Sequence, residues 1–139
     1  MSKFRILAID GGGIRGVIPA VFLATIAQRL GGASLSEHFD LITGTSTGSI
    51  IAAAAASNED MSECIKLYKL LGPEIFPPMT VHRRPWRWTD LFRLEPTYDD
   101  KPLETALQKL FGLNRRLGDD HLTTKLLIPA YDVFNRQIF

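Results

Sequence analysis

The sequence predicts an α/β protein in which a parallel central sheet packs against helices. Two short apolar runs, residues 4–9 and 39–43, have the length and composition of buried strands. A helix-length segment follows each run, over residues 17–30 and 46–57. Because parallel strands are joined by a long crossover, usually helical, this alternation favours parallel pairing.

The first four elements are bounded by clear local signals. The strand at residues 4–9 ends where a glycine-rich turn begins. The helix at 17–30 tolerates Pro19 in its first turn, and the glycines at 31–32 provide its C-terminal end. The helix at 46–57 is apolar on nearly every face, so we expect it to lie beneath other layers.

A third helix is expected over residues 61–71. Asp60 or Ser62 can cap its start, and Gly72 is placed to end it. Residues 73–98 carry five prolines and little periodicity, which predicts a long loop. Loops of this length in compact domains are usually either functional or mobile.

The last part of the sequence predicts a helix followed by strands. Asp100 can cap a helix over residues 101–111, and Gly112 is expected to end it. Residues 124–133 have the composition of one strand, and residues 134–136 of a turn that leads into another.

Composition and charge exclude several classes of protein. The formal net charge of +1 gives no electrostatic argument for nucleic-acid binding. The single cysteine, Cys64, cannot form an internal disulfide, which suits a reducing compartment. The most apolar later stretch, residues 49–56, is about half as long as a bilayer span requires. We therefore expect a cytoplasmic protein whose membrane contact, at the inner surface, is at most peripheral.

Residues 44–48 form the more specific of two glycine-framed turns. The pattern Gly-Thr-Ser-Thr-Gly, between an expected strand and an expected helix, predicts a nucleophile elbow that exposes Ser46. A serine hydroxyl needs such aiming, together with a neighbouring base, because it is a poor nucleophile at neutral pH. The alternative is that Ser46 only caps the helix.

Residues 10–16, Asp-Gly-Gly-Gly-Ile-Arg-Gly, form the other turn. Three consecutive glycines cost backbone entropy, which is justified where N–H groups must face an anion such as an oxyanion. One alternative is a tight turn without a ligand. Another is a dinucleotide site, because the glycines fit Gly-x-Gly-x-x-Gly, although Glu37 and Asp40 come later than the expected acidic residue.

With both turns in place, the chain resembles the patatin-like phospholipases. The matching segments are residues 10–16, residues 44–49, the run at 39–42 that leads into the elbow, and residues 127–132. The resemblance implies that residues 1–139 are the N-terminal portion of a single three-layer patatin-like domain, without an internal boundary and incomplete at its C-terminus. It also implies a serine lipid acyl hydrolase that cleaves fatty-acyl esters of phospholipids or other acyl lipids without a metal or cofactor.

The resemblance assigns roles to residues of both turns. Ser46 is the implied nucleophile. The implied oxyanion loop consists of Gly11, Gly12, Gly13, Arg15 and Gly16. The rest of the elbow consists of Gly44, Thr45, Thr47 and Gly48.

The family's base is an aspartate in an Asp-Gly-Gly or Asp-Gly-Ala step downstream of the elbow. The only Asp-Gly step here is Asp10-Gly11, within the oxyanion loop, and Asp132 is followed by Val133. We therefore expect the base to lie beyond residue 139. If 139 residues were the natural length, we would expect negligible hydrolysis, and the chain would be a catalytically silent anion- or lipid-binding module.

Two further groups of residues suggest other hypotheses. His121 follows Ser46 and Asp99 in the order of an α/β-hydrolase triad, although its polar neighbours Asp119 and Asp120 favour a solvated histidine. A cluster of cations and indoles suggests a lipid-surface patch, the alternative being that the indoles anchor the loop to the core. This cluster consists of Arg83, Arg84, Trp86, Arg87 and Trp88. The three histidines and one cysteine have no metal-ligand spacing, and His38 is expected in a loop or cap.

Overall fold

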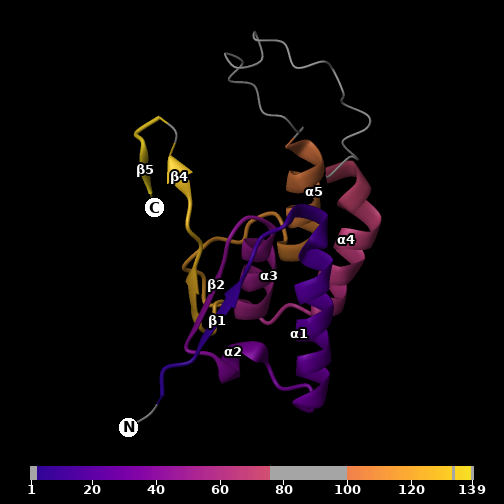
Figure 1. The fold of residues 1–139 in the computed structure, drawn as a ribbon, viewed down its shortest axis with the longest axis vertical. Helices are drawn as coiled ribbons and strands as arrows, with labels where there is room; N and C mark the ends of the chain where they lie inside the picture. Colours follow the sequence, from indigo (N-terminus) through magenta and orange to yellow (C-terminus); the bar gives the residue numbers. More distant parts are fainter. Residues whose placement is uncertain (1–2, 76–99, 133, 139) are drawn as a thin grey trace.

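The computed structural model describes residues 3–75, 100–132 and 134–138 (Figure 1). Its elements follow the predicted order, with a 3-10 helix, η1, and a short helix, α2, added. They are β1 (Ile6–Ile9), η1 (Gly13–Gly16), α1 (Val17–Arg29), α2 (Leu35–His38), β2 (Leu41–Gly44), α3 (Thr47–Ala56), α4 (Met61–Ile75), α5 (Lys101–Phe111), β3 (Lys125–Leu127), β4 (Tyr131–Asp132) and β5 (Gln137–Ile138).

The central sheet is parallel, with the strand order β1-β2-β3. In its register Ile9 lies opposite Gly44, and Thr43 lies opposite Leu127. Because β1 and β2 end at the same level, the two glycine turns that follow them leave the sheet side by side. The predicted fold class is confirmed.

Helix α3 is the centre of the core, as its all-round apolar sequence predicts. Figure 1 shows α3 against β1 and β2, with α1, α4 and α5 around it. Ile51, Ala52 and Ala54 are fully buried, and alanines allow this close approach of the helix to the sheet. Cys64 of α4 is also buried, and burial raises the pKa of its thiol to about 12.

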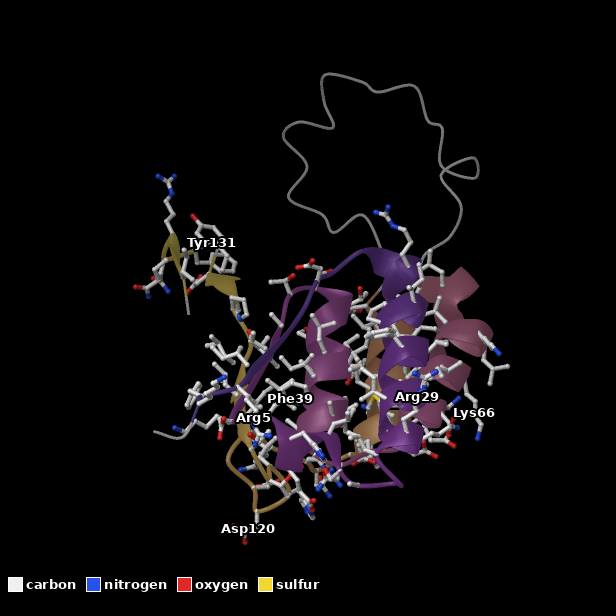
Figure 2. All side chains as sticks on the ribbon, turned by 60° about the horizontal axis from the view of Figure 1, so that its bottom comes forward. Arg5, Arg29, Phe39, Lys66, Asp120 and Tyr131 are labelled. Carbon is white, nitrogen blue, oxygen red and sulfur yellow. The ribbon has the colours of Figure 1, made fainter. Side chains whose placement is uncertain are left out.

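The helices lie on one side of the sheet. Figure 2 shows Arg29 and Lys66 on the helical side, away from Arg5 near the strands. On the strand side, Ile6 is 56% exposed and Leu127 52% exposed, while Ile9 is buried. This in–out alternation is that of a sheet with one face packed against helices.

The ends of the helices test the predicted capping signals. The glycines at 31–32 have positive φ and donate to the last carbonyls of α1, as predicted. Asp60 caps α4, because its carboxylate accepts the N–H of Ser62 at 2.8 Å. Gly112, with φ of 84°, ends α5, but Asp100 makes no side-chain capping bond because it already has helical dihedral angles.

Gly72 does not end α4, contrary to the prediction, and α4 continues to Ile75. A side chain at Gly72 would collide with Cδ1 of Ile14 in η1. The glycine therefore serves close packing between helices, so the loop predicted from residue 73 does not begin there. The remainder of that loop, together with Asp99 and the arginine–tryptophan cluster, lies outside the described residues.

The single strand predicted at residues 124–133 is wrong. The chain forms β3, leaves the sheet at Pro129, and then forms β4, which pairs antiparallel with β5. Proline has no N–H for a ladder hydrogen bond, which explains the break. Asp132 accepts the N–H groups of Phe134 and Asn135 in the predicted turn, and its hydrogen bonds to Asn135 lower its pKa.

Candidate active site

The two glycine turns contact each other directly through their backbones. The N–H of Thr45 donates to the carbonyl of Ile9 at 3.2 Å, and the N–H of Gly11 donates to Oγ1 of Thr45 at 3.2 Å. The parallel register brings these segments together although about 35 residues of chain separate them. The elbow and the glycine loop therefore form one site at the carboxyl edge of the sheet.

Glycine is required at this contact for steric reasons. A Cβ at Gly11 would lie 2.6 Å from the carbonyl oxygen of Thr45 and 2.7 Å from Cβ of Ser46. A Cβ at Gly48 would lie 2.7 Å from the carbonyl oxygen of Asp10. The backbone of the first turn thus lies against the base of the Ser46 side chain.

Ser46 has the strained backbone geometry that the predicted nucleophile elbow requires. Its φ of 53° and ψ of −129° are unusual for a residue with a side chain, and such strain concentrates at functional sites. It occupies the N-cap position of α3 but makes no capping hydrogen bond, so the helix-cap alternative is wrong. The residue is exposed, and its hydroxyl has no hydrogen-bond partner among the described residues.

The N–H groups of the glycine loop differ in availability. That of Gly11 is occupied by Thr45, contrary to the expectation that it would face an oxyanion. Those of Gly12 and Gly13 have no acceptor within the described part of the chain. The carbonyl of Gly12 accepts the backbone N–H and the Nε–H of Arg15, at 3.2 and 3.4 Å. Because a trans peptide directs its N–H opposite to its carbonyl, Gly13 presents its N–H away from Arg15.

Thr47 adds two features that sequence reasoning did not weigh. Its N–H belongs to the residue after the candidate nucleophile, which is where elbow enzymes take an oxyanion donor. Its hydroxyl is buried without a hydrogen-bond partner among the described residues. The elbow pattern in the sequence is enough to identify the N–H of Thr47 as a possible oxyanion donor. The burial of its hydroxyl depends on tertiary packing and has no sequence signal.

We predict that Thr47→Val increases the free energy of unfolding by about 1 kcal/mol, because it replaces an unsatisfied buried hydroxyl with a methyl group of similar shape. Thr43→Val is the matched control. The hydroxyl of Thr43 donates to the carbonyl of Leu127 at 2.8 Å, so that change should lower stability by about 1 kcal/mol. Urea denaturation measures both variants. Destabilisation of both to the same extent would contradict this account of Thr47.

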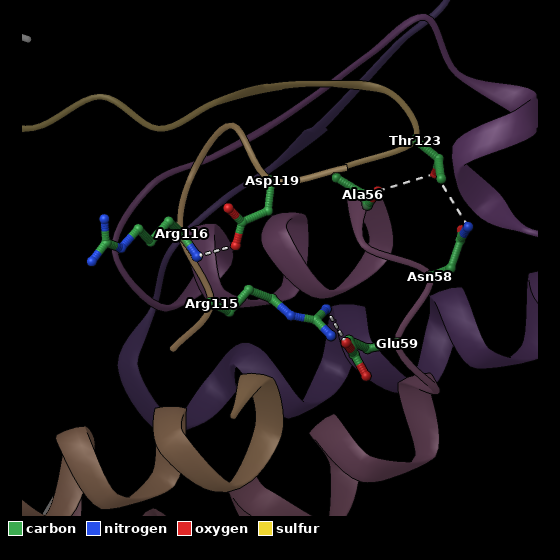
Figure 3. A network of polar contacts seen from close by, with 7 residues as sticks. All are labelled: Ala56, Asn58, Glu59, Arg115, Arg116, Asp119 and Thr123. Atoms are coloured by element: carbon green, nitrogen blue, oxygen red, sulfur yellow. Dashed lines mark hydrogen bonds and ion pairs between the residues drawn. The ribbon is translucent and has the colours of Figure 1, made fainter. Parts of the chain in front are cut away.

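The structure excludes the Ser–His–Asp hypothesis. Figure 3 shows the segment before β3 tied to the C-terminal end of α3, where Thr123 donates to the carbonyl of Ala56. His121 lies in that segment and borders a cavity of about 320 Å³ together with Ser57. Ser46 is at the opposite end of the 10-residue α3, about 15 Å away.

Several other side chains are committed to structural contacts. Asp40 accepts the N–H of Arg5 at 2.7 Å, and Asp132 is held in its turn. His38 contacts the carbonyl of Ser34 at 3.0 Å, at the end of α2. In the part of the chain that is described, no group of three or more histidine, cysteine or acidic side chains is arranged to bind a metal. No described helix is both long and apolar enough to cross a membrane.

An apolar groove of about 400 Å³ borders the glycine loop, between β1 and α1. Gly11, Arg15 and Gly16 line the end of the groove nearest the site. Ile18, Phe22 and Ile26 of α1 line its length. Ile18 and Phe22 are 65% and 66% exposed.

Comparison with known proteins gives consistent matches. The family described as patatin-like phospholipase matches residues 7–135. The chain is 35% identical to Patatin-like protein 2 of Oryza sativa subsp. japonica and 31% identical to the cGAMP-activated phospholipase of Vibrio cholerae, over 99% and 95% of its length. It is 33% identical, over 92% of its length, to the protein of Solanum tuberosum named Probable inactive patatin-3-Kuras 1.

These alignments cover 36%, 39% and 34% of the respective relatives, so the chain spans about a third of their length. The match extends over both glycine turns, the sheet, and the described helices. The chain belongs to the patatin-like phospholipase family.

Proposed function

We propose that this chain carries the nucleophile and the oxyanion donors of a serine hydrolase that cleaves acyl esters of phospholipids. Family membership supports hydrolysis of lipid esters in general terms. The observation that carries the residue assignment is the close contact between Gly11 and Ser46, which puts the glycine loop beside the strained serine. A turn that served only to connect a strand to a helix would not require its backbone to lie so close to the side chain of Ser46.

In the proposed reaction, Oγ of Ser46 attacks the ester carbonyl carbon, and its proton passes to a base. The carbonyl oxygen gains negative charge, which the N–H groups of Gly12, Gly13 and Thr47 stabilise, aided by the positive end of α3. Collapse of this intermediate breaks the ester C–O bond, the base gives its proton to the leaving oxygen, and the alcohol, a lysolipid, departs and leaves an acyl-serine. Water then attacks the acyl-serine, releases the fatty acid and restores Ser46.

The proton acceptor we propose is an aspartate outside residues 1–139, as the family resemblance implies. Asp40 ion-pairs with Arg5 before the start of β2, at the opposite end of that strand from Ser46. Asp132 is engaged by backbone N–H groups in the turn after β4. Asp10 is the first residue of the turn at residues 10–16, whose proposed role is to hold the oxyanion.

We propose that the groove between β1 and α1 accommodates the acyl chain. Ile18→Gln places an amide in this groove at an exposed position, so the fold should be retained. We expect KM for long-chain esters to rise about 10-fold, as for the loss of 1–3 kcal/mol of apolar contact, with little change for acetyl esters. An equal effect on both ester classes would contradict this placement of the acyl chain.

The direct test is release of fatty acid from phosphatidylcholine vesicles by the protein that contains residues 1–139, compared with its Ser46→Ala variant. We expect the wild type to release fatty acid and lysolipid and the variant to release neither. Vesicle binding without release would instead favour the silent lipid-binding module. Equal release by both proteins would exclude Ser46 as the nucleophile.

A further inference from the structure

Tyr68 of α4 contacts both glycine turns at once. Its hydroxyl donates to the carbonyl oxygen of Thr47, the residue after Ser46, at 3.1 Å. Its ring lies against Gly16, where a Cβ would be 2.5 Å from the tyrosine oxygen and 2.8 Å from Cζ. Tyr68 is only 3% exposed, so these contacts hold it within the core.

A second contact one helical turn along strengthens this link between α4 and the loop. Gly72 lies four residues after Tyr68, on the same face of α4, and packs against Ile14 of η1. Helix α4 therefore supports η1 at two points, Ile14 and Gly16. Through Tyr68 it also supports the first residue of α3.

We propose that Tyr68 is a positioning residue that fixes the glycine loop relative to Ser46. This inference rests on the proposed function. The ring limits how far Gly16 and the preceding glycines can move toward α4, and the hydroxyl holds the backbone immediately after the nucleophile. The hydroxyl of Tyr68 donates to Thr47 and, among the described residues, makes no hydrogen bond to the hydroxyl of Ser46, so Tyr68 acts through the two turns.

The environment of Tyr68 suits this role. Burial raises the pKa of its hydroxyl to about 12, so the group remains a neutral donor throughout the range in which an ester hydrolase would work. The acceptor is the backbone carbonyl of Thr47, the same residue whose N–H is proposed as an oxyanion donor. A small displacement here would shift an oxyanion donor, and misplacement of about 1 Å can cost 100-fold in rate.

The first test does not depend on activity. Tyr68→Phe keeps the ring on Gly16 and removes the hydrogen bond to Thr47. We expect amide hydrogen exchange to accelerate up to about 10-fold in residues 44–50, the equivalent of one lost hydrogen bond, and to accelerate in residues 10–17 as well. Tyr131→Phe, in the exposed β4, is the matched control and should leave both segments unchanged. Unchanged exchange in either segment of Tyr68→Phe would overturn the proposal.

The second test separates positioning from general destabilisation. In the lipid assay, Tyr68→Phe should lower kcat about 10-fold and leave KM unchanged, since it disturbs only interactions that form in the transition state. Cys64→Ala, one turn earlier on α4, removes a buried thiol but keeps the hydroxyl of Tyr68 that donates to Thr47, so it should leave kcat per folded molecule unchanged. An increase in KM at constant kcat would overturn the positioning role. If the wild type releases no fatty acid, the proposed function fails, and the exchange result still decides the role of Tyr68.

Discussion

Ser46→Ala is expected to reduce both fatty-acid release and covalent labelling by a fluorophosphonate at least about 1,000-fold. In labelling, Oγ of the serine bonds to phosphorus and fluoride leaves, so the reaction requires the same exposed, activated hydroxyl. Ser46 alone in this site combines exposure, positive φ and a hydroxyl without a partner among the described residues. Intact-protein mass spectrometry of the labelled protein that contains residues 1–139 measures the effect.

Two variants show whether this loss is chemical rather than structural. Ser57→Ala changes a serine at the other end of α3 and should retain full labelling. Ser46→Gly should be inactive yet more stable by about 1 kcal/mol, because glycine adopts positive φ without strain. Labelling of Ser46→Ala at the wild-type rate would exclude Ser46, and destabilisation of Ser46→Gly would contradict the strain at this residue.

Gly48→Ala is expected to destabilise the protein by more than about 3 kcal/mol, the range of severe overpacking. Inside a helix, replacing glycine with alanine normally stabilises a protein by about 1 kcal/mol. A loss of stability in Gly48→Ala would therefore have the opposite sign to the one that helix propensity predicts. A Cβ at this position would meet the carbonyl oxygens of Ile9 and Asp10, which belong to the end of β1 and the turn after it. Backbone atoms fixed by the sheet cannot move aside as a flexible side chain would.

Gly12→Ala is the control for Gly48→Ala. Gly12 has an extended φ of 163°, and an added Cβ would meet nothing closer than Cβ of Arg15 at 3.6 Å. Stability should therefore change by no more than about 0.5 kcal/mol. Urea denaturation compares the two variants. A Gly48→Ala protein as stable as the wild type would contradict the close approach of the two turns.

Local signals were sufficient for most elements of the fold. Short apolar runs predict the strands before both glycine turns and the buried helix α3. Residues that favour helix caps predict the glycine end of helix α1. Glycines that end helices or strands, and continuous runs of apolar residues, are local features of a few neighbouring positions, so they can be read directly from the sequence. The elbow and the glycine loop belong to the same category, since each is a contiguous segment between two elements.

The features that could not be predicted from the sequence depend on contacts between segments that are distant along the chain. Gly72 has the local appearance of a helix end, and only its packing against Ile14 reveals another use. The sequence predicts a free N–H at Gly11, whereas the fold brings Thr45, 34 residues further along the chain, close enough to accept it. The link from Tyr68 to Thr47 spans 21 residues and has no sequence pattern of its own.

The most direct test of this account is the crystal structure of the protein after fluorophosphonate labelling. The phosphonyl oxygen occupies the position of the oxyanion formed in ester hydrolysis. We expect the phosphorus on Oγ of Ser46 and this oxygen within about 3.1 Å of the backbone nitrogens of Gly12 and Gly13. A phosphonyl oxygen directed into solvent, with both glycine N–H groups bonded elsewhere, would contradict the central claim that these turns form one catalytic site.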